Sequence, residues 1–304
     1  VYNYKTGEVL CMLSSPTYDP LDPPEDVEND PAYEGVYLNR FLSGTFPPGS
    51  VFKTVTLAAA IENIPDLFSR TWTCTGSTVV GGETITCPHA HGALDISSAL
   101  ANSCNGVFAQ LAAELGPERM KQYTEQAGLT ASYSVSGLHT AAGRFDFSGT
   151  TGQLGWAGVG QYNDLANPCA IMVYMGAIAQ GGKTAVPELV LKTVNPLGLP
   201  SLPTLTSRTK SLINADTAAT MADMMAKNVT DTYGASRFPN MDICAKSGTA
   251  EVGGGKAPHA WFAGFLRNED APYAFVVLVE NGGSGADVAG SVAAKVLDAL
   301  VNGY

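Results

Sequence analysis

The chain has 304 residues, 45% of them hydrophobic and 15% charged, a composition typical of a folded protein with a substantial core. Its net charge of −11 and the absence of any run of Lys and Arg argue against a nucleic-acid ligand. No stretch reaches the roughly 18 apolar residues that a membrane-spanning helix requires. We therefore expect a large globular domain.

The first half of the chain predicts a strand hairpin followed by a mainly helical region. Residues 1–4 and 8–14 are expected to form strands joined by a turn, and the stretch 16–35, rich in Pro, Asp and Glu, a surface loop. Alternating Gly, Thr and Val over 66–96 predict short strands or an irregular lobe. Helical spacing of apolar residues predicts four helices, over 54–62, 95–101, 105–115 and 118–127.

The second half begins with a stretch rich in Gly, Ser and Thr, 129–165, which predicts a long loop. Helices are expected over 167–180, 215–227 and 289–301, with Asn214 as a helix cap. Strands are expected over 244–252, 259–266 and 273–280. Strands at both chain ends with helices between them predict an α+β fold, in which an antiparallel sheet from the two ends carries helices on its faces beside a mainly helical lobe.

Ser50 and Lys53 form the first candidate catalytic pair. They are three residues apart, after Pro47-Pro48-Gly49 and before an apolar helical run, so both side chains can lie on one face of a first helical turn. A serine nucleophile needs a base within hydrogen-bond reach, and a helix N-terminus favours developing negative charge. Ser207-Arg208-Thr209-Lys210 has the same spacing without that lead or helix, and we expect it to be non-catalytic.

A second motif, Ser103-Cys104-Asn105, follows 53 residues after Ser50. Ser or Asn before a helical run is commonly a helix cap. The same residues could instead bring a hydroxyl and an amide to a loop tip that faces the cleft. The pattern alone leaves both interpretations open.

A third motif, Lys246-Ser247-Gly248-Thr249, lies within a predicted strand. Because side chains alternate along a strand, Ser247 and Thr249 share one face and Lys246 points to the other. The missing side chain of Gly248 is expected to let a ligand backbone approach closely. Two hydroxyls with a cation behind them suit the recognition of a carboxylate.

Cys74 and Cys87 are separated by 12 residues, and His89 and His91 follow directly. Three interpretations are open: a local disulfide in an exported domain, two free thiols, or a structural zinc site built from the two cysteines and a histidine. Six cysteines in a chain of 304 residues are too few for a disulfide scaffold.

The order Ser-x-x-Lys, Ser-x-Asn, Lys-Ser-Gly resembles the active-serine motifs of penicillin-binding proteins and related β-lactamases. The whole chain resembles the transpeptidase domain of a class B penicillin-binding protein, including its lead into the serine and the stretch His259–Phe265. The resemblance implies a β-lactamase/transpeptidase-like fold and one catalytic unit over 1–304 with an inserted helical lobe. It also implies an N-terminal membrane anchor and pedestal domain outside this chain. Tyr162 follows Gly160-Gln161 where family members often have Gly, which is a departure from the family pattern.

The resemblance also implies the catalytic roles. Ser50 would attack the penultimate D-alanine of a peptidoglycan stem peptide and form an acyl-enzyme, with Lys53 as its general base. Ser103 would relay a proton to the leaving nitrogen. Asn105 would hold Lys53 and the substrate amide, and Lys246 would set the field near Ser103.

The implied substrate contacts lie on the third motif. Ser247 and Thr249 would bind the terminal carboxylate, and Gly248 would be a further substrate-binding residue. The backbone N–H groups of Ser50 and Thr249 would form the oxyanion hole. β-Lactam antibiotics, as mimics of the D-Ala-D-Ala terminus, would acylate Ser50.

The family resemblance implies a D,D-transpeptidase that requires no cofactor and is anchored at the extracytoplasmic face of the bacterial cell membrane. Its partners would be peptidoglycan stem peptides, β-lactams and other cell-wall synthesis proteins such as a glycosyltransferase, with no nucleic acid. Two alternatives are a serine β-lactamase and a non-catalytic β-lactam sensor. No Glu-x-x-x-Asn pattern of the kind that supports deacylation in class A β-lactamases lies between Ser103 and Lys246.

Overall fold

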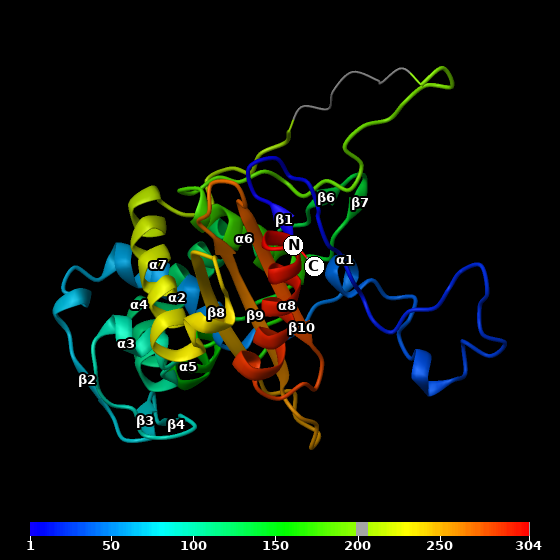
Figure 1. Ribbon diagram of the computed structural model, residues 1–304. Coiled ribbons are helices and arrows are strands. Elements are labelled where there is room, and N and C mark those ends of the chain that lie inside the picture. The colour runs from blue at the N-terminus through cyan, green and yellow to red at the C-terminus, as the bar shows by residue number, and fades with distance from the viewer. Residues whose placement is uncertain (199–205, 304) are drawn as a thin grey trace.

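The computed structural model describes residues 1–198 and 206–303 and shows a mixed fold built on one central sheet (Figure 1). The sheet is antiparallel, in the order β1-β10-β9-β8. The expected α+β architecture, with a sheet from both chain ends, is confirmed. The strands are β1 (Tyr2–Asn3), β8 (Ile243–Ala250), β9 (His259–Leu266) and β10 (Tyr273–Val279).

The expected strand over 8–14 is wrong. Only Glu8 and Val9 pair with other residues, through isolated bridges to Glu188 and Tyr2. The segment therefore makes too few ladder hydrogen bonds to continue the sheet beyond β1.

Strand β9 is buried along its whole length because both faces of the sheet are covered. Trp261 and Phe265 point into the larger core, shared with the helical lobe. Phe262 and Leu266 point into a smaller core beneath the C-terminal helix. Because side chains alternate along a strand, β9 contributes residues to both cores.

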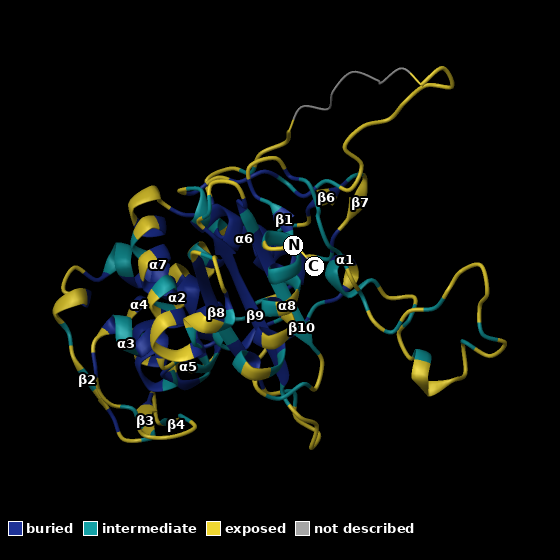
Figure 2. Ribbon diagram, viewed as in Figure 1, coloured by how far each residue is buried: buried dark blue, intermediate teal, exposed yellow. Residues whose placement is uncertain are grey.

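Helices cover both faces of the sheet (Figure 2). On one face α6 packs against β9 and β10, and α7 packs against β8. On the other face α8 and the short helix η6 pack against β9 and β10. These elements are α6 (Pro168–Ala179), α7 (Ala215–Asn228), η6 (Gly285–Ala289) and α8 (Gly290–Val301).

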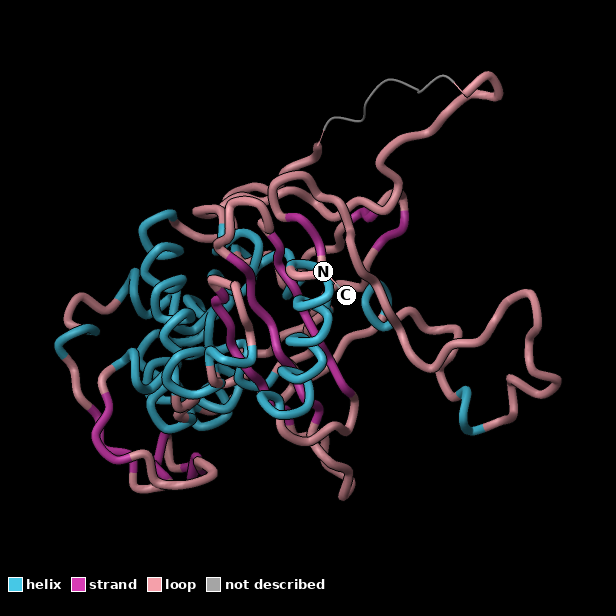
Figure 3. Tube along the Cα trace, viewed as in Figure 1, coloured by secondary structure: helices cyan, strands magenta, loops and turns pink. Residues whose placement is uncertain are grey.

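The lobe packs around a central helix, α2 (Lys53–Asn63), which contacts both α4 and α7 and has eight buried residues in succession from Lys53 to Ala60. The two helices expected over 105–127 form a single element with a break at Gly116, which has φ 78° and precedes Pro117. Figure 3 shows short strands at the edge of this lobe. The lobe elements are α3 (Ile96–Ala101), α4 (Asn105–Gln126), β2 (Trp72–Cys74), β3 (Ser77–Val80), β4 (Glu83–Thr86) and β5 (Gly92–Leu94).

The expectation of one long loop over 129–165 is wrong, because it contains α5 (Thr151–Gly158) and a small hairpin. Glycines obscured this helix in the sequence, yet they allow close packing. A Cβ at Gly155 would lie 3.2 Å from the Ala109 Cβ of α4, so the two helices meet almost backbone to backbone. The remaining short elements are α1 (Arg40–Ser43), β6 (Ser134–Val135), β7 (Leu138–His139) and the turns Pro31–Tyr33, Leu67–Ser69, Val229–Tyr233 and Ala235–Arg237.

The helix predicted over 215–227 is confirmed as α7, but Asn214 does not cap it through its side chain. The Asn214 Nδ2 group donates instead to Glu62, at 2.6 Å. In the described part of the chain, no helix combines the length and the apolar character needed to span a lipid bilayer.

Candidate active site

Ser50 lies on a short helical turn, η2 (Gly49–Phe52), which leads directly into α2. The turn packs against β8, and a Cβ at Gly49, which has φ 52°, would lie 2.8 Å from the carbonyl oxygen of Thr249. Trp261 of β9 holds the preceding loop, because its Nε1 donates to the carbonyl oxygen of Pro47 at 2.9 Å. The serine is thus fixed between the central helix and the edge of the sheet.

Lys53 joins the first two motifs. Its Nζ lies 3.0 Å from Ser50 Oγ, 3.1 Å from Ser103 Oγ, 2.6 Å from the Ser103 carbonyl oxygen and 2.7 Å from Asn105 Oδ1. The side chain is fully buried, and this burial lowers the pKa of Lys53 to about 7. A lysine with this pKa is substantially neutral near neutral pH, so it has a lone pair available to accept a proton.

Ser103 lies between two lysines. Lys246 Nζ lies 3.0 Å from Ser103 Oγ, and burial, together with the nearby cation of Lys53, places the pKa of Lys246 well below its ordinary value. Ser103 has φ 52°, a left-handed conformation that costs a non-glycine residue roughly 1–2 kcal/mol. Strained backbone of this kind clusters at functional sites, and here it aims a hydroxyl at both amines.

The third motif forms the edge of the site along β8. Ser247 is half-buried and Thr249 is exposed, whereas Lys246 is fully buried, in agreement with the predicted alternation. We expected Gly248 to leave room for a ligand backbone, and this explanation is wrong. A Cβ at Gly248 would lie 3.0 Å from Val51 Cγ2 and 3.1 Å from the Pro48 carbonyl oxygen. Glycine is required here so that β8 can pack against the turn that carries Ser50.

Tyr233 is a site residue that the sequence did not reveal. Its buried hydroxyl accepts hydrogen bonds from the Ser247 backbone N–H at 3.0 Å and from Ser247 Oγ at 3.1 Å. The tyrosine lies at the end of a helical turn that continues α7, and no local pattern connects it to a motif 14 residues later.

The structure separates the duplicate of the first motif from this site. Ser207 and Lys210 lie outside any helix, in an exposed segment whose Arg208 forms a bridge with Ala185. A spacing of three residues without a helix does not bring the two side chains together.

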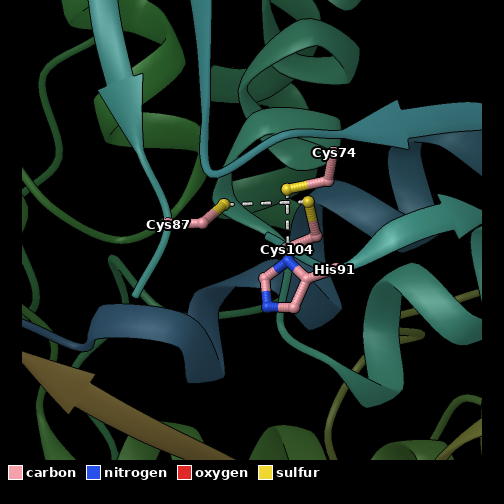
Figure 4. A group of neighbouring side chains, drawn as sticks. All are labelled: Cys74, Cys87, His91 and Cys104. Carbon is pink, nitrogen blue, oxygen red and sulfur yellow. Dashed lines mark hydrogen bonds between the residues drawn. The ribbon is translucent and has the colours of Figure 1, made fainter. Parts of the chain in front are cut away.

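A second group of reactive side chains lies beside the site. Cys74, Cys87, His91 and Cys104 converge so that their ligand atoms all lie within 4.8 Å of one another (Figure 4). None of these cysteines forms a disulfide in the described chain. His89, the other histidine considered from the sequence, is exposed, with its ring 4.5 Å from that of His91.

A serine at a helix start that contacts a buried lysine, with a second serine held between that lysine and another, characterises a class of acyl-transfer centres. Over residues 1–301 the sequence matches the model of the penicillin binding protein transpeptidase domain, and the chain belongs to this family.

Among the relatives, the peptidoglycan D,D-transpeptidase PbpA of Mycolicibacterium smegmatis is 30% identical over 95% of this chain. The chain spans 62% of the length of that relative. The structure of penicillin-binding protein A from Mycobacterium tuberculosis as a ceftriaxone acyl-enzyme complex superimposes with a TM-score of 0.90 at 26% identity, covering 99% of this chain and 73% of that one. The D,D-transpeptidase domain of a peptidoglycan glycosyltransferase from Eggerthella lenta superimposes with a TM-score of 0.87 at 25% identity, covering 99% of this chain and 77% of that one.

Proposed function

We propose that this chain is the catalytic domain of a serine D,D-transpeptidase that cross-links peptidoglycan stem peptides. The observation that carries the proposal is the position of Lys53 Nζ, within 3.1 Å of both Ser50 Oγ and Ser103 Oγ. One amine can therefore take the proton of the nucleophile and stand next to the hydroxyl that passes a proton to the leaving group.

In the proposed acylation, Ser50 Oγ attacks the carbonyl carbon of the penultimate D-alanine while its proton moves to neutral Lys53. The C–N bond to the terminal D-alanine breaks, and the leaving nitrogen receives a proton through the Ser103 hydroxyl. An amine of a second stem peptide then attacks the ester carbonyl and gives up a proton to neutral Lys53. The new C–N bond is the cross-link, and the ester C–O bond breaks as Ser50 Oγ takes that proton back from Lys53. Lys246 Nζ donates a hydrogen bond to Ser103 Oγ at 3.0 Å and so orients the hydroxyl of that relay.

For substrate binding, we propose that Ser247 and Thr249 bind the terminal carboxylate from the exposed edge of β8. The backbone N–H groups of Ser50 and Thr249 form the proposed oxyanion hole. The close approach of Gly49 to the Thr249 carbonyl oxygen supports this assignment, because it brings the backbone of both segments together. Gly248 contributes by allowing that approach.

A serine β-lactamase is the second candidate, and the hydrogen-bond network disfavours it. Rapid hydrolysis of an acyl-enzyme requires a base that activates water. In the part of the chain that the structure describes, no Asp or Glu side chain hydrogen-bonds to Ser50, Lys53 or Ser103. We therefore expect a long-lived penicilloyl adduct.

The decisive experiment is mass spectrometry of the protein after treatment with benzylpenicillin. We expect one adduct on Ser50, absent in Ser50→Ala and retained in Ser207→Ala, which removes the serine of the duplicate motif. Labelling that survives Ser50→Ala would contradict the assignment. Rapid loss of the adduct would favour a β-lactamase, and failure to join a D-Ala-D-Ala or thioester donor to an amine acceptor would favour a sensor.

We further propose that residues 1–304 act as one catalytic unit, attached in the full-length protein to a membrane anchor and a pedestal domain at the extracytoplasmic face. Its proposed partners there are other cell-wall synthesis proteins, such as a glycosyltransferase. The proposed reaction uses only side chains and backbone groups and requires no cofactor. A structural zinc ion in the cysteine and histidine cluster is proposed in addition, outside the reaction itself.

A further inference from the structure

The four clustered side chains come from the ends of four different elements. Cys74 ends β2 and pairs in register with Gly92 of β5, so His91 lies beside it, with its Nδ1 3.3 Å from Cys74 Sγ. Cys87 follows β4, and Cys104 precedes the first residue of α4. These four elements bring Cys74, Cys87, His91 and Cys104 together, as Figure 4 shows.

The separations fit a tetrahedral zinc site. Zinc binds thiolate sulfur at about 2.3 Å, so two sulfurs on a tetrahedral ion lie roughly 3.8 Å apart. Cys87 Sγ and Cys104 Sγ lie 3.8 Å apart, well beyond a disulfide bond of about 2.05 Å. Three sulfurs and one imidazole nitrogen complete a four-ligand set of the kind found in closed structural sites.

The short strands around the cluster have little packing of their own. Its two sheets have two strands each, with only three or four residues a strand, and isolated hairpins of this size are marginally stable. Apart from Cys74, the strands bury only Val80, Ile85 and Leu94. Each strand thus contributes a single buried residue to the larger core, and a metal ion that joins the strand ends would add stability to these hairpins.

Two of the four ligands adjoin the catalytic network. Cys104 lies between Ser103 and Asn105, whose backbone and side-chain oxygens contact Lys53 Nζ. Cys87 follows Thr86, whose carbonyl oxygen accepts a hydrogen bond from Asn105 Nδ2 at 2.7 Å. Asn105 is therefore held between the two ligand-bearing segments.

We propose that Cys74, Cys87, His91 and Cys104 bind one zinc ion, and that this ion positions Ser103 and Asn105 around Lys53. The ion remains outside the reaction and acts on it only through the placement of the second motif. The metal-binding part of the proposal is independent of the proposed transpeptidase function, whereas the positioning part rests on it.

The metal-binding part is tested on the whole chain, purified with zinc under reducing conditions. We expect elemental analysis to find about one zinc per chain, and exchange with Co²⁺ to produce the absorption bands of a tetrahedral thiolate site. Cys74→Ser should lose both signals, whereas the controls His89→Ala and Cys11→Ser should keep them. Absence of zinc, unchanged cobalt bands in Cys74→Ser, or a disulfide revealed by a mass lower by two hydrogens would overturn the site.

The positioning part is tested by the rate of acylation with benzylpenicillin. His91→Ala is expected to acylate about 10- to 100-fold more slowly, with an altered pH profile, while its circular dichroism spectrum remains that of folded protein. His91→Cys, which offers a fourth thiolate, should keep both zinc and the acylation rate, so a failure of His91→Ala to fold does not remove the test.

Two outcomes separate the parts of the proposal. If zinc binds but its removal by a chelator leaves the rate and pH profile of acylation unchanged, the positioning part is refuted. If the zinc-loaded protein shows no penicillin adduct at all, the proposed function fails while the metal site stands.

Discussion

Lys53 determines the pH dependence that we expect of acylation. Burial lowers its pKa to about 7, and a general base acts only when it is neutral. The rate of labelling by benzylpenicillin should therefore rise with pH and reach half its maximum near the pKa of Lys53. The titratable groups that interact with this amine are Lys246, Cys87, His91 and Cys104, of which Lys246 also lies in the hydrogen-bond network.

The measurement is the second-order rate of labelling between about pH 5.5 and 9, a range that brackets the expected midpoint. Lys53→Met is the informative variant, because Met fills a similar volume without a buried charge. It should remain folded and lose acylation by about 10²- to 10⁴-fold. A rate independent of pH in the parent protein would exclude Lys53 as the base.

The motif residues were predictable because their geometry is local or ordered along the chain. Ser50 and Lys53 share a helical face through their spacing, and Ser247 and Thr249 share a strand face through alternation. Tyr233 was not predictable, because its contact with Ser247 depends on how α7 packs on β8. No periodicity encodes such a contact.

At the scale of the element, the loop after α5 holds one residue in an unfavourable backbone conformation. Tyr162 has φ 71°, in the left-handed region, and 44% of its surface is exposed. Relief of this strain by Tyr162→Gly is worth about 1–2 kcal/mol, offset by about 0.5–1 kcal/mol for the greater freedom of glycine in the unfolded chain. We expect a net gain of up to about 1.5 kcal/mol in the free energy of unfolding.

Urea unfolding with an unchanged slope would measure this gain. Tyr162→Ala is the matched control, because it removes the ring but keeps the Cβ that makes a positive φ unfavourable. It should not be stabilised. Equal stability of the glycine and alanine variants would show that backbone strain at residue 162 is negligible.

Elements with a strong apolar period were predictable, and those that depend on close packing were not. The helix from Pro168 to Ala179 lies within the predicted range and begins at its proline. Helix α5 was missed because Gly155 and Gly158 weaken the helical pattern of the sequence. The two glycines allow α5 to pack closely against α4, and that benefit cannot be read from the local sequence. Its one local signal was the capping box between Thr150 and Gln153.

At the scale of the whole molecule, the site joins parts of the chain that are distant in sequence. Lys53 and Ser103 are 50 residues apart, and Ser103 and Lys246 are 143 residues apart, yet their side chains meet. The order of the motifs predicted this meeting only through the family resemblance. From physics alone, the sequence establishes an α+β architecture and leaves open which loops converge.

The larger core extends from the lobe into the sheet without interruption. It contains Ile85 and Leu111 of the lobe together with Trp261 and Phe265 of β9. Because α2 packs against helices on both sides, we expect the lobe and the sheet to unfold in one cooperative transition.

A variant that keeps a single tryptophan tests this expectation. Trp72→Phe combined with Trp156→Phe leaves Trp261 as the only fluorescent tryptophan, and it reports from β9 at the centre of the sheet. Denaturation of the zinc-loaded protein followed by this fluorescence, by far-ultraviolet circular dichroism and by penicillin labelling should give one midpoint. Loss of helix and of labelling at a denaturant concentration that leaves Trp261 in its native environment would mean that the lobe is a separate folding unit. The proposed single catalytic unit would then be two domains whose interface forms the active site.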